Sequence, residues 1–232
     1  MNKLEIRNIP ELPYYVTEAL NQLRISLGFA GEDVRSIMIT SSIPNEGKSF
    51  VSMQLWKMIA EVGNNVLLID GDLRDSVMRK DYGLKMEGEF NGVVHALAGK
   101  CGFNDAIYST NIPNAYLMPV ELHVANPVNL LEGRQFNELL KQCREEFDYV
   151  LVDSPPIGVV ADALTIGPHT DGCLLVVRSA FTPRKTVENS INLLQRSGIP
   201  ILGTVLNRAD MSRKGAYYYN KYYNYSHYYN EG

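Results

Sequence analysis

Residues 42–49 combine the residue types that hold a phosphate group. They read Ser-Ile-Pro-Asn-Glu-Gly-Lys-Ser and stand between a short apolar run and a helix-like stretch. Where a strand turns into a helix, free backbone N–H groups and the helix dipole favour phosphate oxygens. The Lys48 ammonium would neutralise oxygens that gain charge during phosphoryl transfer, and the Ser49 hydroxyl would bind Mg²⁺. We therefore expect a nucleotide-binding loop formed by Ser42, Pro44, Asn45, Glu46, Gly47, Lys48, Ser49 and Phe50.

Three carboxylates support this interpretation, because they come just after two further apolar runs of strand length. Residues 67–74 read Leu-Leu-Ile-Asp-Gly-Asp-Leu-Arg and contain Asp70 and Asp72, and residues 149–156 contain Asp153. One such Asp is common as a helix cap. The loop alone could be a chance turn, since its usual first glycine is Ser42 here. The loop and the carboxylates together indicate a site for phosphate and metal.

The chemistry of these groups suggests a role for each. Mg²⁺ prefers hard oxygen ligands and keeps several waters, which suits Ser49 directly and Asp72 and Asp153 through water. Asp70 is the best candidate to accept a proton from an attacking hydroxyl. Arg74 could orient the carboxylates, meet phosphate or form a structural salt bridge. The expected catalytic residues are Lys48, Asp70, Asp72 and Asp153.

These groups must be positioned by strands and helices that the sequence also indicates. Runs that are apolar at every position predict strands buried on both faces, as in a parallel sheet covered by helices. The runs lie at residues 36–40, 66–69, 115–118, 149–152, 173–177 and 201–206, with helices expected at 48–62, 129–147 and 183–197. This order predicts an α/β fold with a doubly wound, mostly parallel sheet of the P-loop NTPase type. Ligands gather at the carboxyl ends of such strands, where we expect Asn207 near the base and Asp162 as a helix cap or a support for the carboxylates.

Composition excludes several classes of protein. With 232 residues, 45% of them hydrophobic and 21% charged, the chain suits a soluble globular domain and not a disordered, collagenous or coiled-coil protein. Its net charge of −4 gives no overall electrostatic case for binding nucleic acid. No apolar run approaches the ~20 residues of a membrane span, and no signal peptide is recognisable. Three separated cysteines fit a reducing cytosol.

The last residues differ in composition from the rest. We expect a domain at residues 1–210, with an amphipathic helix at about 14–29, and a flexible tail at residues 211–232. The tail contains no Val, Ile or Leu, and its tyrosines follow no helical period. Its Arg213, Lys214 and Lys221 against Glu231 give it a charge of +2. It holds eight of the fourteen tyrosines, Tyr217, Tyr218, Tyr219, Tyr222, Tyr223, Tyr225, Tyr228 and Tyr229.

From about residue 10 to its end, the sequence resembles the bacterial tyrosine kinases of capsule and exopolysaccharide synthesis. The shared motifs are Ser-x-x-Pro-x-Glu-Gly-Lys-Ser at 41–49, Ile-Asp-Gly-Asp-Leu-Arg at 69–74 and Val-Asp-Ser-Pro-Pro at 152–156. Asn-Pro-Val-Asn-Leu-Leu at 126–131, Ala-Asp-Ala at 161–163 and the tyrosine-rich end also match.

The resemblance implies an ATP- and Mg²⁺-dependent autokinase that phosphorylates the tyrosine cluster of a neighbouring subunit in trans. It implies regulation of polysaccharide synthesis and export. The protein would be cytoplasmic and recruited to the inner face of the membrane by a membrane-spanning adaptor of the polysaccharide co-polymerase type. A cognate tyrosine phosphatase and a homo-oligomer, such as a ring, are further implied partners. Glu18 and Arg24 of the first helix would contribute to the contacts between subunits.

The sequence departs from the family pattern at several positions. Asn21 replaces the middle Arg of a Glu-x-x-Arg-x-x-Arg pattern, and Asn45 and Phe50 replace a Gly and a Thr of the loop. Trp56 stands where a small residue is usual, which predicts core packing, with a nucleotide contact as the alternative. Residues 120–123, Val-Glu-Leu-His, replace a glycine-containing turn.

Two other functions compete with that of a kinase. One is a P-loop ATPase switch, although Ile43 stands where such switches carry a signature Lys. The other is a scaffold that binds nucleotide without kinase activity.

Overall fold

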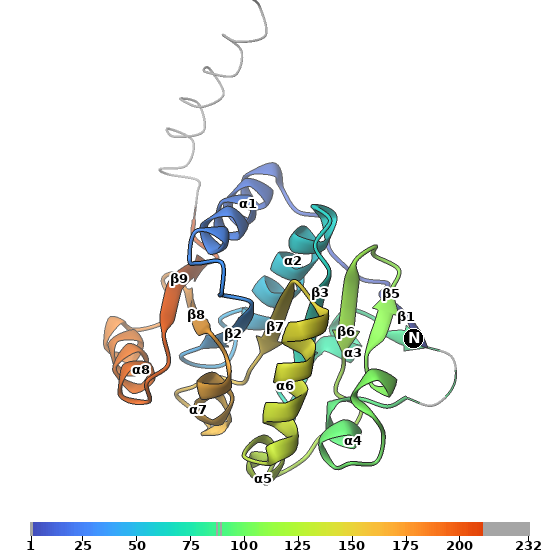
Figure 1. The fold of residues 1–232 in the computed structure, drawn as a ribbon. Helices are drawn as coiled ribbons and strands as arrows, with labels where there is room; N and C mark the ends of the chain where they lie inside the picture. Colours follow the sequence, from blue (N-terminus) through green and yellow to red (C-terminus); the bar gives the residue numbers. More distant parts are fainter. Residues whose placement is uncertain (1, 87, 89, 211–232) are drawn as a thin grey trace, which may run out of the picture.

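The strands of the protein form one mixed sheet. The computed structural model describes residues 2–86, 88 and 90–210, and the predicted tail lies outside them. Within these residues the strand order is β4-β1-β5-β6-β3-β7-β2-β8-β9 (Figure 1). The strands are β1 (Asn2–Glu5), β2 (Ser36–Ser41), β3 (Val66–Asp70), β4 (Lys85–Met86), β5 (Tyr108–Thr110), β6 (Ala115–Met118), β7 (Tyr149–Asp153), β8 (Gly172–Arg178) and β9 (Ile201–Asn207).

The sheet is parallel from β6 to β9 and becomes mixed toward β4. In the parallel part, β6, β3, β7, β2, β8 and β9 pair with their neighbours in the same direction. Antiparallel pairs join β5 to β6 and β1 to β4. Because parallel strands end at the same edge, the residues after β2, β3, β7, β8 and β9 meet along one side of the sheet.

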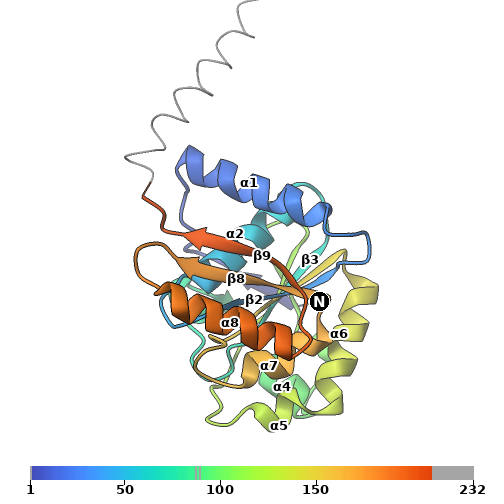
Figure 2. The same cartoon turned by 90° about the vertical axis from the view of Figure 1, so that its left-hand side faces the viewer.

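Helices cover both faces of this sheet (Figures 1 and 2). One core contains side chains of α1, α2 and α3, and the other contains side chains of α4 to α8. The helices are α1 (Tyr14–Gly28), α2 (Lys48–Glu61), α3 (Met78–Asp81), α4 (Val93–Leu97), α5 (Val128–Leu131), α6 (Arg134–Glu146), α7 (Asp162–Ile166) and α8 (Arg184–Arg196), with 3-10 turns η1 (Phe103–Asp105) and η2 (Gly167–His169). The predicted doubly wound α/β fold is confirmed.

None of the described helices is long and apolar enough to cross a membrane.

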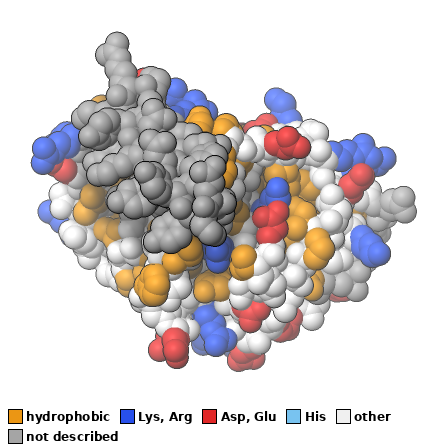
Figure 3. All heavy atoms as spheres, turned by 90° about the horizontal axis from the view of Figure 1, so that it is seen from above, with side chains coloured by type: hydrophobic (Ala, Val, Ile, Leu, Met, Phe, Trp, Pro, Cys, Tyr) orange, Lys and Arg blue, Asp and Glu red, His pale blue; other side chains and the backbone are white. Residues whose placement is uncertain are grey.

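The face on which α1 lies shows hydrophobic side chains among scattered charges of both signs (Figure 3). On α1 and directly after it, the exposed large apolar residues are Tyr14, Tyr15, Ile25 and Phe29.

All six predicted strands are present, but the helix expected at 129–147 is interrupted. Gly133 has an extended backbone and separates the short α5 from α6. A side chain at Gly133 would come within 3.2 Å of the Leu130 carbonyl oxygen, so the close turn between the helices favours glycine.

Trp56 lies in the core between α2 and the sheet, as its packing interpretation predicted. Its side chain is fully buried, and its indole N–H donates to the carbonyl oxygens of Val66 at 3.2 Å and Tyr116 at 2.9 Å. The indole therefore ties α2 to β3 and β6 instead of contacting a nucleotide.

Replacing Trp56 tests this packing role. Trp56→Phe removes the indole donor and part of the buried ring, so the free energy of unfolding should fall by about 2–4 kcal/mol. Urea unfolding measures this change, with Phe29→Leu at an exposed position as the control. A loss below about 0.5 kcal/mol would show that the indole does not hold α2 on the sheet.

Candidate active site

The loop between β2 and α2 has the shape of a phosphate-binding turn. Asn45 and Gly47 both have left-handed backbone conformations, with φ of 66° and 88°, and α2 begins directly afterwards at Lys48. Asn is among the few residues other than glycine that tolerate this region, so the loop forms without a glycine at 45. Gly47 suits its position because a side chain would be strained at this φ, and an added Cβ would also lie 2.2 Å from the Asn207 Nδ2 atom.

The parallel register brings two of the predicted carboxylates side by side. Asp70 ends β3 and pairs with Asp153, which ends β7, and Asp153 also pairs with Ile39 of β2. Both carboxylates are buried, and Asp72 follows two residues after Asp70. Gly71 allows this close approach, because an added Cβ would lie 2.9 Å from the Asp153 carbonyl oxygen.

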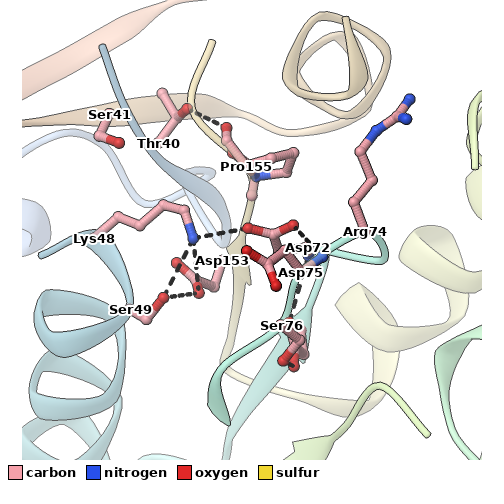
Figure 4. A network of polar contacts seen from close by, with 12 residues as sticks. Thr40, Ser41, Lys48, Ser49, Asp72, Arg74, Asp75, Ser76, Asp153 and Pro155 are labelled. Carbon is pink, nitrogen blue, oxygen red and sulfur yellow. Dashed lines mark hydrogen bonds and ion pairs between the residues drawn. The ribbon is translucent and has the colours of Figure 1, made fainter. Parts of the chain in front are cut away.

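Lys48 and Ser49 reach from the start of α2 into this group of carboxylates (Figure 4). The Lys48 Nζ atom lies 3.0 Å from Asp72 Oδ2 and 3.8 Å from Asp153 Oδ2. Burial lowers the pKa of Lys48, but the charges of Asp153 and Asp72 outweigh it, and the net pKa is raised. The ammonium therefore remains protonated at neutral pH.

Hydroxyl groups from α2 hold Asp153. Ser49 Oγ donates to Asp153 Oδ2 at 2.6 Å, and Ser52 Oγ donates to Asp153 Oδ1 at 2.9 Å. The oxygens of Ser49, Asp72 and Asp153 thus converge near Lys48. This is a set of hard donors that fits a divalent cation completed by water and phosphate. The described residues hold no group of three His, Cys, Asp or Glu side chains that could bind a metal ion by themselves.

Asp70 has a proton affinity unlike that of an ordinary carboxyl group. Burial, reinforced by the negative charge of Asp153, raises the pKa of Asp70 to about 7, although Ser76 and Lys48 act in the opposite direction. The Ser76 hydroxyl donates to Asp70 Oδ2, and the Asp72 N–H lies 3.4 Å from Asp70 Oδ1. A carboxyl group that titrates near neutral pH suits proton transfer.

Arg74 forms the structural salt bridge that was one of its three predicted roles. Its Nε and Nη2 atoms donate to the two oxygens of Asp162 at 2.6 and 2.9 Å, and Nη1 donates to the Ala125 carbonyl oxygen at 2.6 Å. Asp162 is fully buried. In Figure 4, Arg74 extends away from Lys48 and Asp153. The pair joins the segment after β3 to α7.

The other predicted site residues divide between the loop and places remote from it. Ser42 and Glu46 are buried within the loop, and Asn207 donates from β9 to the Glu46 carbonyl oxygen at 2.9 Å. Glu18 and Arg24 lie on α1, where Asn21 Nδ2 donates to Glu18 Oε1 at 3.3 Å. Pro44 lies within the loop and Phe50 in the first turn of α2, and the predicted tyrosine acceptors lie outside the described residues.

Sequence reasoning missed several residues that contact the site. Ser52 was detectable, since it lies three residues after Ser49 on one helical face. Ser76 and Tyr82 carry no such signal; the Tyr82 hydroxyl lies 3.4 Å from the Ser49 carbonyl oxygen. Outside this group, Glu121, in the segment that departs from the family pattern, accepts the N–H of His95 at 2.6 Å at the start of α4.

Comparisons with known proteins agree with this geometry. A family model described as an AAA domain matches residues 35–180. The tyrosine-protein kinase CpsD of Streptococcus agalactiae is 35% identical over 195 residues, which cover 84% of each chain.

Solved structures with a similar fold include a tyrosine kinase domain and a septum site-determining protein. The kinase domain of the Escherichia coli tyrosine kinase ETK has a TM-score of 0.77 and 30% identity, covering 90% of this chain and 86% of that one. The septum site-determining protein MinD of Pyrococcus horikoshii, complexed with Mg-ADP, has a TM-score of 0.65 and 28% identity, covering 78% and 72%.

The titration of Asp70 should be visible in folding stability. Between about pH 4 and 7, the folded protein keeps a proton on Asp70 that the unfolded chain has released, so this group lowers stability as the pH rises. The wild-type protein should therefore lose up to ~4 kcal/mol in free energy of unfolding between pH 4 and pH 8. Asp70→Asn, which has no carboxyl group to titrate at this position, should not show this loss. Urea unfolding in EDTA without nucleotide measures the difference.

Asp33→Asn, at an exposed position, serves as the control and should track the wild type across this range. Parallel pH profiles for Asp70→Asn and the wild type would contradict the raised pKa.

Proposed function

The chain belongs to the bacterial tyrosine-protein kinases of capsule and exopolysaccharide synthesis, and on that premise we propose which reaction its site performs. The reaction is transfer of the γ-phosphoryl group of ATP to a tyrosine hydroxyl, with Mg²⁺ as the metal. The acceptors are the tyrosines of the C-terminal cluster in a neighbouring copy. The observation that supports this best is the position of Asp70 beside the Lys48, Ser49 and Asp153 group.

Each residue has a defined task in this reaction. The N–H groups of Gly47 to Ser49 would bind phosphate oxygens, and the Lys48 ammonium would stabilise the charge that develops on them. Ser49 would bind Mg²⁺ directly, and Asp72 and Asp153 would hold it through water. When bound, Mg²⁺ neutralises charge on the phosphates.

Asp70 would accept the proton of the incoming phenol. The pKa of Asp70, about 7, lies below that of a free phenol, ~10. The Asp70 carboxylate therefore does not deprotonate the tyrosine before the reaction begins. As the phenol oxygen bonds to phosphorus its pKa falls, and Asp70 can then receive the proton. Asn207, through its contact with the loop, would lie close to the base.

The family also supports proposals about partners. We infer a homo-oligomer in which α1 contributes Glu18 and Arg24, and a membrane-spanning adaptor that recruits this cytoplasmic protein to the inner face of the membrane. Each phosphotyrosine adds about −1.5 to −2 charges, so modification of the +2 tail would reverse its charge and favour separation of subunits. A cognate tyrosine phosphatase would restore the starting state.

An ATPase switch remains the second candidate, because the MinD fold is similar. The tyrosine kinases match over more of the chain, with 90% coverage for the ETK kinase domain against 78% for MinD. This difference favours the kinase.

Phosphotyrosine formation tests the proposal. Purified protein incubated with ATP and Mg²⁺ should acquire phosphotyrosine, and Lys48→Met should reduce the rate at least 100-fold because it removes the charge opposite the phosphates. Removal of residues 211–232 should abolish the signal. Lys57→Met, on the outer side of the same helix, is the matched control and should retain activity. ATP hydrolysis without any phosphotyrosine would support the switch instead.

A further inference from the structure

A buried carboxylate inside the phosphate-binding loop has no part in the reaction described above. Glu46 is fully buried, and the ion pairs of the described residues do not include it. An unpaired charge in this environment is strongly unfavourable unless hydrogen-bond donors surround it. The contacts of Glu46 therefore indicate what this residue does.

Donors from two separate parts of the chain meet this carboxylate. The Ile43 N–H, within the loop, donates to Glu46 Oε2 at 2.8 Å. The Arg178 N–H donates to Glu46 Oε1 at 3.2 Å, and the Thr182 hydroxyl donates to the same oxygen. One carboxylate thus joins the phosphate-binding loop to residues 178–182, which we call the β8–α8 segment.

The β8–α8 segment has a fixed shape of its own. The Thr182 N–H donates to the Arg178 carbonyl oxygen at 3.2 Å, and the Ser179 N–H donates to the Asn207 carbonyl oxygen at 2.9 Å. Ala180 has a left-handed backbone with φ of 53°, a conformation that alanine rarely adopts. Its hydrogen bonds within the segment and to β9 allow it to act as a support for the loop.

The loop needs such a support because its own backbone is unusual. Asn45 and Gly47, on either side of Glu46, are both left-handed, and the residue at 45 is not glycine. Arg178 Nη1 also lies 3.4 Å from the Asn45 carbonyl oxygen. The carboxylate of Glu46 and the side chain of Arg178 therefore both hold the part of the loop that precedes Gly47.

We propose that Glu46 is a positioning residue that keeps the phosphate-binding loop in its binding shape by fastening it to the β8–α8 segment through Thr182 and Arg178. Its carboxylate does not contact the nucleotide. This inference rests on the proposed function, since it assumes that the loop binds ATP phosphates.

Thr182 gives the sharpest test, because among the described residues Glu46 is the part of the loop to which its hydroxyl donates. Thr182→Val keeps the shape of the side chain but removes the hydroxyl donor, and should raise the KM for ATP about tenfold. The kcat should stay within about threefold, because the interaction serves binding of the ground state and the transition state alike. Thr182→Ser restores the hydroxyl and should restore the KM. Thr165→Val, the same substitution on α7, should leave both constants unchanged.

Nucleotide binding measured alongside distinguishes the possible failures. The dissociation constant of Mg-ADP, from calorimetric titration, should rise about tenfold in Thr182→Val and in Glu46→Gln. Unchanged binding in both variants would overturn the proposal, as would weaker binding in Glu46→Gln alone, which would indicate a direct contact. A fall in kcat with an unchanged KM would also overturn it, because that pattern marks an interaction made only in the transition state. If the wild-type protein bound no nucleotide, the proposed function itself would fail.

Discussion

The structure depends on a balance of charge at one edge of the sheet. The register of β3, β7 and β2 fixes Asp70 beside Asp153, two buried carboxylates that repel each other and lose hydration. Lys48 and the hydroxyls of Ser49, Ser52 and Ser76 offset this penalty. Removing the Lys48 ammonium would leave these carboxylates buried without their compensating charge.

The same arrangement prepares the site for phosphoryl transfer. Phosphoryl transfer needs little covalent chemistry from a protein and depends on positioning and on stabilising charge. Here the acidic groups stand on the rigid ends of parallel strands, and the cation stands on the first turn of α2. A carboxyl group that titrates near neutral pH therefore lies within electrostatic reach of a protonated ammonium. Preorganisation of this kind reduces the reorganisation that the reaction requires.

Local patterns in the sequence predicted much of this structure, and contacts between distant residues account for the rest. The apolar runs before Asp70 and Asp153 were long enough to identify buried parallel strands and to place their ends at one edge. The short strands β1, β4 and β5 carry no such run and were missed. The break at Gly133 was also missed, because helical periodicity continues on both sides of it. Asp162 was expected as a helix cap or a support for the carboxylates, and only the fold shows its partner Arg74 from 88 positions away.

The most direct test is a crystal structure with Mg²⁺ and a non-hydrolysable ATP analogue. We predict that the triphosphate lies on the N–H groups of Gly47 to Ser49, that the Lys48 ammonium leaves Asp72 for a phosphate oxygen, and that Asp70 faces the γ-phosphate side. A nucleotide bound elsewhere, with the 3.0 Å contact between Lys48 and Asp72 unchanged, would contradict the account.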